Sequence, residues 1–364
     1  MQQRNKLLFG LLGMIISLGS LAQNISNKGK DFWVGYGHHQ YMEFAGDNSQ
    51  NMTLYISVEG LPAGVPYATV TITIDSSGLT PALWWKRVYR IPAYTVLSID
   101  NIATPAFSFS PAAALSYGPM PKGPTNAAAS NTSTSYDCRL FSDPCPAGTG
   151  GFGLFRKKGI HITSDYDIVA YSHIYGGVSS GATMLLPTNS WGYSYTTINS
   201  RQVDAASSYN FFFIIAKDDN TRVKITGSQA PRGGVGCTFI PPIAGTPFYV
   251  DLNKGQIYQY VGQADAAGNG VQLTSSKVES VPNVFGECKK IAVFAGSSRT
   301  GGENNGGCTN SGRDNDMVQC FPEHTWGKIM LQHLFQVLQV PQVLVLVILQ
   351  VLPIKLFQKI PVLW

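Results

Sequence analysis

One stretch of the sequence has the spacing of a catalytic nucleophile. "GVSSG" (Gly177–Gly181) matches the pattern G-x-S-x-G, in which a sharp turn between a strand and a helix presents the central serine. The segment that follows, "ATMLLPTNSWG", reaches Pro187 too soon for a helix of useful length. The sequence therefore predicts that Ser179 lies in a turn between two strands, and we expect no catalytic residue in this chain.

Histidines are the next residues that could do chemistry. His38 and His39 are adjacent, and neighbouring side chains on a strand point to opposite faces. A metal site needs three or four converging ligands, which His161 and His173 would complete only if the fold brought them near. We expect structural histidines that are hydrogen-bonded to the backbone.

Oxygen-rich side chains gather in "RDNDM" (Arg313–Met317), where Asp314, Asn315 and Asp316 follow a Gly-rich segment. Such loops suit calcium, although the spacing and the distal glutamate of an EF-hand are absent. The alternative is a solvated turn whose Asp and Asn side chains bond their own backbone. Calcium is the one cofactor that the sequence suggests.

Tryptophans fall into two groups. Trp33, Trp191 and Trp326 recur at the starts of similar segments, which favours a role in packing. Trp84 and Trp85 do not recur, and on a strand one of the two would face outward. We hypothesise that Trp84 and Trp85 contact a glycan or protein ligand.

The composition favours strands over helices. Of the 364 residues only 13% are charged, aromatic residues make up 11%, and no block of helix-forming residues at helical spacing precedes the C-terminal tail. Alternation in "ATVTITI" (Ala68–Ile74) and aromatic and β-branched residues in "NFFFIIA" (Asn210–Ala216) predict strands. We expect an all-β protein.

An internal repeat organises these strands. "LPTNSWG" (Leu186–Gly192) and "FPEHTWG" (Phe321–Gly327) share one pattern, and each follows a short apolar run. The prediction is two related antiparallel β-sandwich-like units in tandem, residues 23–187 and 188–322, with a truncated third unit that starts at 323–329. One continuous sandwich or a propeller-like array is the alternative.

The N-terminus has the features of a secretory signal. Arg4 and Lys6 precede an apolar run, Leu7–Ile16, and small residues lead to a cleavage position after Ala22. We therefore expect residues 1–22 to be a signal peptide and the mature chain to be extracellular. The alternative, an uncleaved membrane anchor, needs about 20 apolar residues, and this run is shorter.

Export allows disulfides among the six cysteines, and the sequence alone does not choose the pairing. Close spacing favours Cys138 with Cys145 and Cys308 with Cys320, which leaves Cys237 with Cys288. Buried free thiols are the alternative.

The formal charge of +5 comes largely from the two ends of the chain. Without Arg4, Lys6, Lys355 and Lys359 the body has 26 − 4 = 22 basic residues against 21 acidic ones. A nearly neutral body lacks the basic face that nucleic acid requires, so we expect no nucleic-acid partner.

The tail, Met330–Trp364, differs in composition from everything before it. Its longest unbroken apolar run has 7 residues, far short of the roughly 20 of a membrane span, and prolines interrupt it. One permitted codon spelling of "MLQHLF", shifted by one base, encodes Tyr-Ala-Thr-Ala-Pro, which restores the pattern seen after Trp191. We hypothesise that residues 330–364 are a frameshifted, non-native tail; a hydrophobic sorting tail is the alternative.

The ordered motifs resemble a known family. "NKGKDFWVGYGHHQYM", "GIHITSDYDIVAYSHIYG", "SSGATMLLPTNSWGYSY", "LNKGQIYQYVG", "KKIAVFAGSSRTG" and "DNDMVQCFPEHTWGK" are together similar to the N-terminal domain of IgGFc-binding proteins, particularly its forms in secreted surface proteins of Bacteroidetes. The resemblance implies an extracellular β-rich domain, which in animal mucosal proteins is associated with immunoglobulin Fc binding and mucus.

These observations lead to one expected function and two alternatives. We expect a secreted, surface-associated, adhesin-like binding module for glycoprotein or glycan ligands, with immunoglobulin and mucin as candidate partners. A glycan-directed extracellular hydrolase and a structural spacer of a long surface protein are the alternatives.

Overall fold

The computed structural model describes residues 26–39, 51–74, 85–100, 140, 153–155, 159–176, 179–200, 208–232, 243–263, 270–301 and 313–326. The predicted signal peptide, Trp84 and the tail lie outside these residues. The described chain is built from antiparallel strands, as expected: β1 (Lys28–Val34), β2 (Asn51–Val58), β3 (Ala68–Ile74), β4 (Trp85–Ile91), β5 (Thr95–Asp100), β6 (Gly153–Phe155), β7 (Ile160–Tyr175), β8 (Ser180–Met184), β9 (Ser194–Thr196), β10 (Asn210–Ala216), β11 (Thr221–Thr226), β12 (Phe248–Leu252), β13 (Ile257–Val261), β14 (Lys277–Val281), β15 (Ile291–Gly301) and β16 (Arg313–Gln319).

A seven-stranded sheet forms the first unit. Its order is β4-β3-β7-β2-β5, and β1 and β8 also pair with β7. The 16 residues of β7 serve two sets of neighbours, because its first half pairs with β3 and β1 and its second half with β2 and β8. The alternation in β3 buries Val70, Ile72 and Ile74 in the core of this unit.

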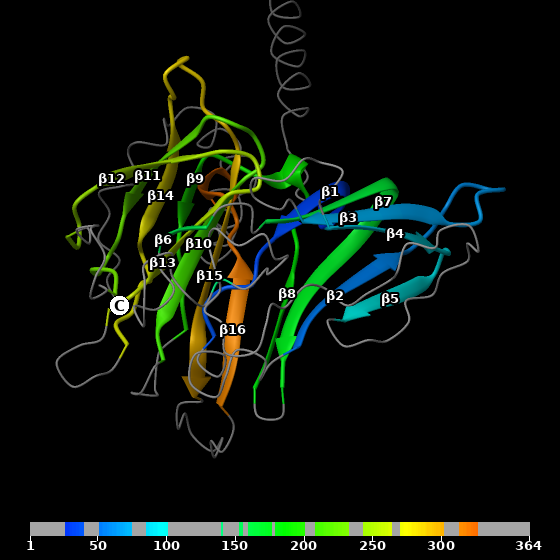
Figure 1. The fold of residues 1–364 in the computed structure, drawn as a ribbon, viewed down its shortest axis with the longest axis horizontal. Helices are drawn as coiled ribbons and strands as arrows, with labels where there is room; N and C mark the ends of the chain where they lie inside the picture. The colour runs from blue at the N-terminus through cyan, green and yellow to red at the C-terminus, as the bar shows by residue number, and fades with distance from the viewer. Residues whose placement is uncertain are drawn as a thin grey trace, which may run out of the picture.

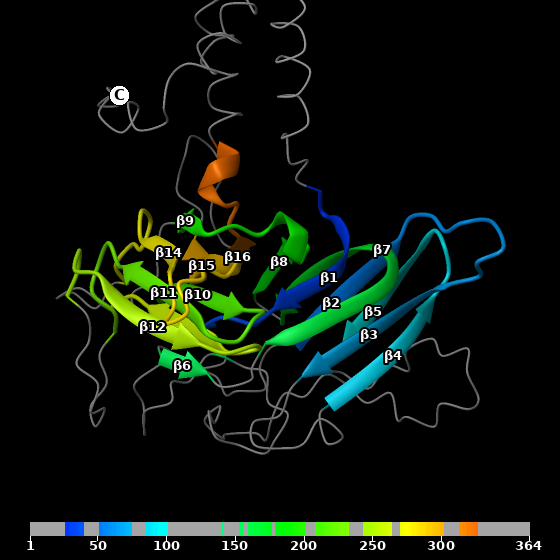
Figure 2. The same ribbon diagram turned by 90° about the horizontal axis from the view of Figure 1, so that it is seen from above.

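Two sheets form the second unit. A five-stranded sheet of order β16-β15-β10-β13-β6 packs against a four-stranded sheet of order β12-β11-β14-β9. In Figures 1 and 2 the first unit lies on one side of the molecule and these two sheets on the other, with β8 and β16 side by side between them.

Strand β10 explains why the five-stranded sheet is the middle layer. All seven of its residues are buried. Phe211, Phe213 and Ile215 belong to the apolar cluster of the first unit, whereas Phe212 and Ile214 belong to the cluster between the two sheets of the second unit. From Phe211 to Ala216 the strand has no polar position, and it is therefore buried on both faces.

The two units share one pattern of strand pairing. We call residues counterparts when they occupy the same place in the register of the two units. The register that joins β2, β7 and β8 is the register that joins β10, β15 and β16; the aligned residues are Tyr55, Tyr171 and Met184 in the first unit and Phe213, Phe294 and Gln319 in the second.

Glycines mark the starts of both units. Gly29 pairs with Ile168, and its counterpart Gly192 bridges to Ile291. A Cβ atom on Gly29 would lie 2.5 Å from Cβ of Pro187, and one on Gly192 would lie 2.4 Å from Cβ of Pro322. Both glycines are therefore required where the start of a unit meets the turn that ends it.

The strand pairing corrects one feature of the predicted repeat. Trp191 precedes Gly192, so its counterpart in the first unit is Lys28 and not Trp33. Trp191 and Trp326 remain equivalent, because each indole Nε1 donates to the carbonyl five residues earlier, Leu186 and Phe321 respectively, at 3.1 Å. Trp33 packs instead between the units, over Gly255.

The predicted division after Pro187 falls between the strands of the two units, except that β6 joins the second unit through β13. The exact boundaries stay a prediction. The apolar cluster that fills the first unit extends onto β10, β13 and β15, so the two units share buried surface. The described part of the chain contains no helix with the length and hydropathy of a membrane span.

Candidate ligand-binding face

An aromatic strip runs along the outer face of the first unit. Strand β2 buries Met52, Leu54 and Ile56 and turns Tyr55 to the other face. On β7 the alternating residues Tyr171, His173 and Tyr175 lie on that same outer face, because Tyr171 is directly opposite Tyr55. We call Tyr55, Tyr171, His173 and Tyr175 the tyrosine–histidine strip.

The rings of the strip are in mutual contact. His173 stacks on Tyr175 with ring centroids 4.7 Å apart, and its ring lies 5.9 Å from that of Tyr55. The imidazole Nε2 of His173 is 2.8 Å from Oγ of Ser180 on β8. Neighbouring rings and this hydrogen bond hold the imidazole in one orientation.

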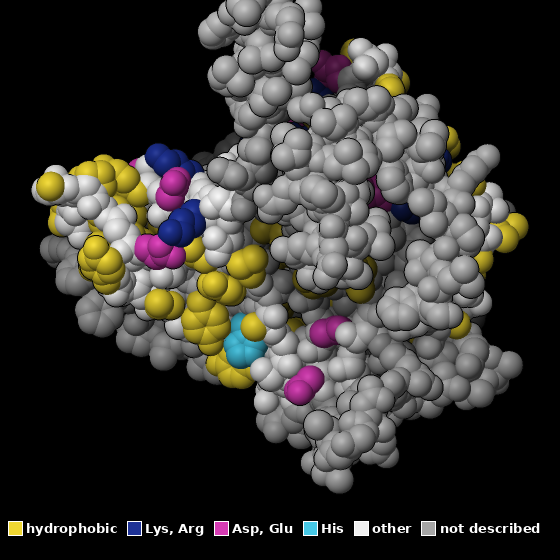
Figure 3. All heavy atoms as spheres, turned by 180° about the vertical axis from the view of Figure 1, so that it is seen from behind, with side chains coloured by type: hydrophobic (Ala, Val, Ile, Leu, Met, Phe, Trp, Pro, Cys, Tyr) yellow, Lys and Arg dark blue, Asp and Glu magenta, His cyan; other side chains and the backbone are white. Residues whose placement is uncertain are grey.

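Polar groups border the strip where the two units meet. The backbone N–H of Ser180 donates to Oδ1 of Asp314 on β16 at 2.9 Å, and Asp314 is exposed. Figure 3, a space-filling view from behind, shows hydrophobic side chains gathered on one face, with histidine and acidic side chains beside them. Ring faces and hydrogen-bonding groups are thus available side by side on one surface.

This arrangement offers both apolar and hydrogen-bonding groups to a ligand. Tyr171 is 38% exposed, so its ring offers an apolar face to a ligand, while imidazole, hydroxyl and carboxylate groups offer hydrogen bonds at the edge. A sugar ring presents the same combination of C–H faces and hydroxyl edges. The strip therefore suits carbohydrate better than a purely apolar ligand.

Ser179 belongs to a buried contact between the units. It is followed directly by strand β8, which agrees with the expected turn between strands and not with a nucleophile elbow. Its hydroxyl donates to Oδ1 of Asn315 and accepts from the backbone N–H of Asn315. Nε2 of His39, 3.3 Å from Oγ of Ser179, must then act as the donor, so His39 is not a base for this serine.

Burial keeps His39 neutral. Desolvation lowers the pKa of His39 to about 3, although a hydrogen bond with Asn315 acts in the opposite direction. The neighbouring His38 donates its backbone N–H to Oε1 of Gln259 on β13. Both side chains are buried. Within the described residues no group of three or more His, Cys, Asp or Glu side chains is placed to hold a metal.

The three candidate calcium ligands have different partners. Asp314 accepts from Ser180, Asn315 bonds Ser179, and Asp316 accepts the backbone N–H of Ser297 at 2.5 Å. Strand β16 therefore holds them in place through protein contacts. Calcium binding at Asp314, Asn315 and Asp316 stays a prediction, which a calcium titration of thermal stability would test.

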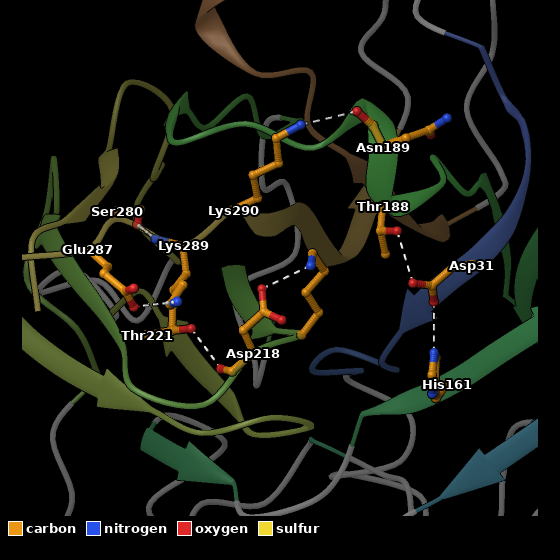
Figure 4. Close-up of polar contacts among 11 residues, drawn as sticks. Asp31, His161, Thr188, Asn189, Asp218, Thr221, Ser280, Glu287, Lys289 and Lys290 are labelled. Carbon is orange, nitrogen blue, oxygen red and sulfur yellow. Dashed lines mark hydrogen bonds and ion pairs between the residues drawn. The ribbon is translucent and has the colours of Figure 1, made fainter. Parts of the chain in front are cut away.

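A polar clamp fixes the turn that links the two units. Asp31 on β1 accepts from His161 Nε2 at 2.7 Å and from Thr188 Oγ1 at 3.0 Å, and Thr188 lies in the linker's short 3₁₀ helix (Figure 4). Burial raises the pKa of Asp31, but the hydrogen bonds and charge of its partners outweigh burial, so the pKa is lowered from its ordinary value. Trp33 stacks on the His161 ring at 4.0 Å.

The second unit has an equivalent clamp with the roles exchanged. Ser194 is the counterpart of Asp31, and Glu323 is the counterpart of Thr188. Here Ser194 Oγ donates to Glu323 Oε2 at 2.7 Å, and Lys277 contacts Glu323 as His161 contacts Asp31. The carboxylate lies on the strand in the first unit and in the turn in the second, and in both units it accepts a hydrogen bond from a hydroxyl group across the contact.

Several predicted residues remain untested. Trp84 lies outside the described residues, and Trp85 begins β4, where its backbone pairs with Ile74. Their contact with a ligand stays a prediction.

The structure does not show the disulfides expected at Cys288 and Cys320. Cys288 is exposed, Cys320 is buried, and both are free thiols. The other four cysteines, Cys138, Cys145, Cys237 and Cys308, lie outside the described residues, and the pairing stays a prediction.

The tyrosine–histidine strip was not among the candidate residues predicted from the sequence. The signal was present in "AYSHIYG", where Tyr171, His173 and Tyr175 alternate with smaller or apolar residues at strand spacing. The spacing places the three on one face, but it does not say whether that face is covered.

Comparison with known proteins gives one match. Residues 181–330 match a protein family whose description is IgGFc binding protein. No curated protein and no solved structure is similar to the chain. The matched region begins within β8 and contains the strands from β9 to β16 and the turn at Trp326.

Proposed function

We propose, from the match of residues 181–330 to the IgGFc binding protein family, that the chain is a secreted, surface-associated module that binds glycoproteins through their carbohydrate. Binding is non-covalent and uses the tyrosine–histidine strip. The second unit supplies the edge of this face through Asp314, so both units contribute to the site.

The strip is the observation that carries this proposal. Aromatic side chains supply contact area at a low cost in conformational entropy, because their rings have few rotatable bonds. Here Tyr55, His173 and Tyr175 are also restrained by one another, and β2, β7 and β8 form a rigid support. A preorganised surface of this kind loses little freedom on binding.

The expected partners follow from the chemistry of the strip. Mucins and immunoglobulins carry sugars whose C–H faces would stack on Tyr171 and whose hydroxyls would reach His173, Ser180 or Asp314. The near-neutral charge of the body gives no electrostatic preference for a highly charged partner.

Capture on immobilised glycoproteins tests the proposal. Intact mucin and immunoglobulin are compared with the same proteins after enzymatic removal of their glycans, and a panel of glycosides is assayed for turnover. The proposal predicts capture by the intact glycoproteins, loss of capture after deglycosylation, and no turnover. Equal capture by deglycosylated protein would show a protein epitope, and turnover would show a hydrolase; either result overturns the proposal.

Two variants make the capture assay specific to the strip. Tyr171→Ala removes the most exposed ring of the strip, and we expect a loss of roughly five- to tenfold in apparent affinity, on the order of 1 kcal/mol for one aromatic contact. Tyr249→Ala is the matched control, because Tyr249 is an exposed tyrosine on β12 in a different sheet. An equal loss in both variants would argue against the strip.

A structural role as a spacer is the second candidate, and one observation favours it. The polar clamp at Asp31 and Thr188 has an equivalent at Ser194 and Glu323, at the end of the second unit. A contact that recurs at the end of each unit is typical of proteins built from repeated units. A spacer would give neither capture nor turnover in the same assay.

A further inference from the structure

The residues directly opposite the tyrosine–histidine strip on the neighbouring strands are all uncharged. The strip lies on β2 and β7, and the strand register gives the residue that pairs with each of its members. These partners on β2, β5 and β8 are Asn51, Thr53, Ser98, Ser180, Ala182 and Met184. Arginine and lysine are the side chains that bind the carboxylate of an acidic sugar through charge-assisted hydrogen bonds. The strip has no such donor at these positions.

One end of the strip carries a negative charge instead. Asp314 on β16 is exposed, and its Oδ1 accepts the backbone N–H of Ser180 at 2.9 Å. Ser180 lies opposite Tyr175, and its Oγ is 2.8 Å from Nε2 of His173. In the part of the chain that the structure describes, Ser180 is the one hydrogen-bond donor to this carboxylate, and no lysine or arginine forms an ion pair with it. The second oxygen, Oδ2, is therefore available to a ligand.

The aromatic and acidic ends of the strip are too far apart for one sugar ring to contact both. Tyr171 and Tyr175 are four residues apart on β7, about 13 Å at the rise of a strand. Tyr171 is the exposed ring at one end, and Asp314 lies beside Ser180 at the other. A ligand that uses both ends is therefore a chain of linked sugars that lies along β7.

We propose that Asp314 makes the tyrosine–histidine strip selective for neutral oligosaccharides and excludes chains that place sialic acid at this end. The inference rests on the proposed function, because it names the class of sugar that the strip takes. Oδ2 of Asp314 accepts from the hydroxyl groups of a neutral sugar, such as a hexose or an N-acetylhexosamine. Sialic acid would bring a second negative charge to this oxygen with no lysine or arginine opposite the strip to offset it, and like charges repel.

Capture of native and desialylated mucin by the intact protein tests the proposal. Sialidase removes the acidic sugar and leaves the neutral chain, so the comparison separates charge from the presence of glycan. We expect desialylated mucin to bind about tenfold more tightly, and this ratio to fall as salt screens the repulsion. Asp314→Asn keeps the size of the side chain and an oxygen for Ser180, and it should bring the two affinities to within about twofold of each other.

Asp251→Asn is the matched control, because Asp251 is an exposed aspartate on β12, in a different sheet. This variant should keep the ratio of the two affinities that the intact protein has. The ratio also distinguishes selectivity from a purely structural role of Asp314, which would weaken capture of both mucins equally.

The outcomes separate this inference from the proposed function. Equal capture of native and desialylated mucin by the intact protein, with both lost in Tyr171→Ala, would overturn the selectivity and leave the carbohydrate site standing. A ratio that Asp314→Asn does not change would overturn the role of Asp314. Capture of neither mucin, or capture that survives removal of all glycans, would overturn the proposed function and this inference with it.

Discussion

Asp31 and Glu323 perform the same task from opposite sides of equivalent contacts. Asp31 lies on the first strand of its unit and accepts from Thr188 in the linker turn, whereas Glu323 lies in the next turn and accepts from Ser194 on the first strand of the second unit. A basic side chain completes each contact, His161 in one and Lys277 in the other. The repeat thus preserves an interaction while exchanging the residues that make it.

The clamp at Asp31 should make stability depend on pH. The pKa of Asp31 is lowered in the folded state, so its contribution is fully present above the ordinary value of 3.8 and is lost as the pH falls through the lower folded value. Asp31→Asn should therefore destabilise the protein at pH 7 and have little effect below that pKa. Urea denaturation of both proteins at a series of pH values from 7 downward measures this, and a difference in stability that stays constant as the pH falls through the acid range would contradict the assignment.

His39 should also make the stability of the protein depend on pH, here because folding buries a neutral imidazole. Its pKa falls from 6.5 to about 3 on folding, so the unfolded state binds the extra proton and stability decreases as the pH drops from 6.5 toward 3. The slope is at most about 1.4 kcal/mol per pH unit. His39→Gln should flatten the stability profile between pH 6.5 and pH 4. An unchanged slope in the variant would assign the dependence to other groups.

Phe213 should be among the most costly residues to truncate. Its ring lies between the units, is fully buried and stacks on Phe294 at 4.8 Å. Phe213→Ala should lower the free energy of unfolding by about 3–5 kcal/mol, the cost of removing a buried aromatic side chain. Phe285→Ala, at an exposed turn, should change it by less than about 0.5 kcal/mol, and urea denaturation compares the two.

Gly37 tests the close approach of the two units. A Cβ atom there would lie 2.2 Å from Cε2 of Phe211, so Gly37→Ala should force β10 and the segment after β1 apart. We expect a loss of about 1–3 kcal/mol, as for an overpacked core. Gly60→Ala is the control, because its nearest neighbour would be 4.0 Å away. Equal thermal stability of Gly37→Ala and Gly60→Ala would contradict this packing.

Much of the secondary structure follows directly from local sequence. The alternation of β3 and the unbroken apolar run of β10 each predict a strand and the number of its faces that are buried. The partners of these strands do not follow, because pairing depends on residues far away in the chain. Strand β7 illustrates this. Its 16 residues pair with β3 in the first half and with β2 in the second, whereas in the second unit two separate strands, β14 and β15, make the corresponding pairs with β11 and β10.

The candidate site could not be predicted from local sequence, because the exposure of a strand residue also depends on residues far away in the chain. Tyr171 and Phe294 are counterparts, and both are aromatic residues on a strand with alternating pattern. Phe294 is buried because the first unit covers it, whereas no described residue covers Tyr171 to the same extent. The neighbouring unit decides whether the side chain is exposed, and the residues next to Tyr171 or Phe294 in the sequence do not indicate which unit lies over them.

The most direct test of the account is a calorimetric titration of glycans released from mucin into the intact protein and into the double variant Tyr55→Ala, Tyr171→Ala. The account predicts saturable binding to the intact protein and a loss of roughly 2 kcal/mol or more in the double variant, from two aromatic contacts. Far-ultraviolet circular dichroism and the melting temperature establish that the variant is folded. Equal affinity of the two folded proteins, or no binding to the intact protein, would contradict the proposal that the tyrosine–histidine strip binds carbohydrate.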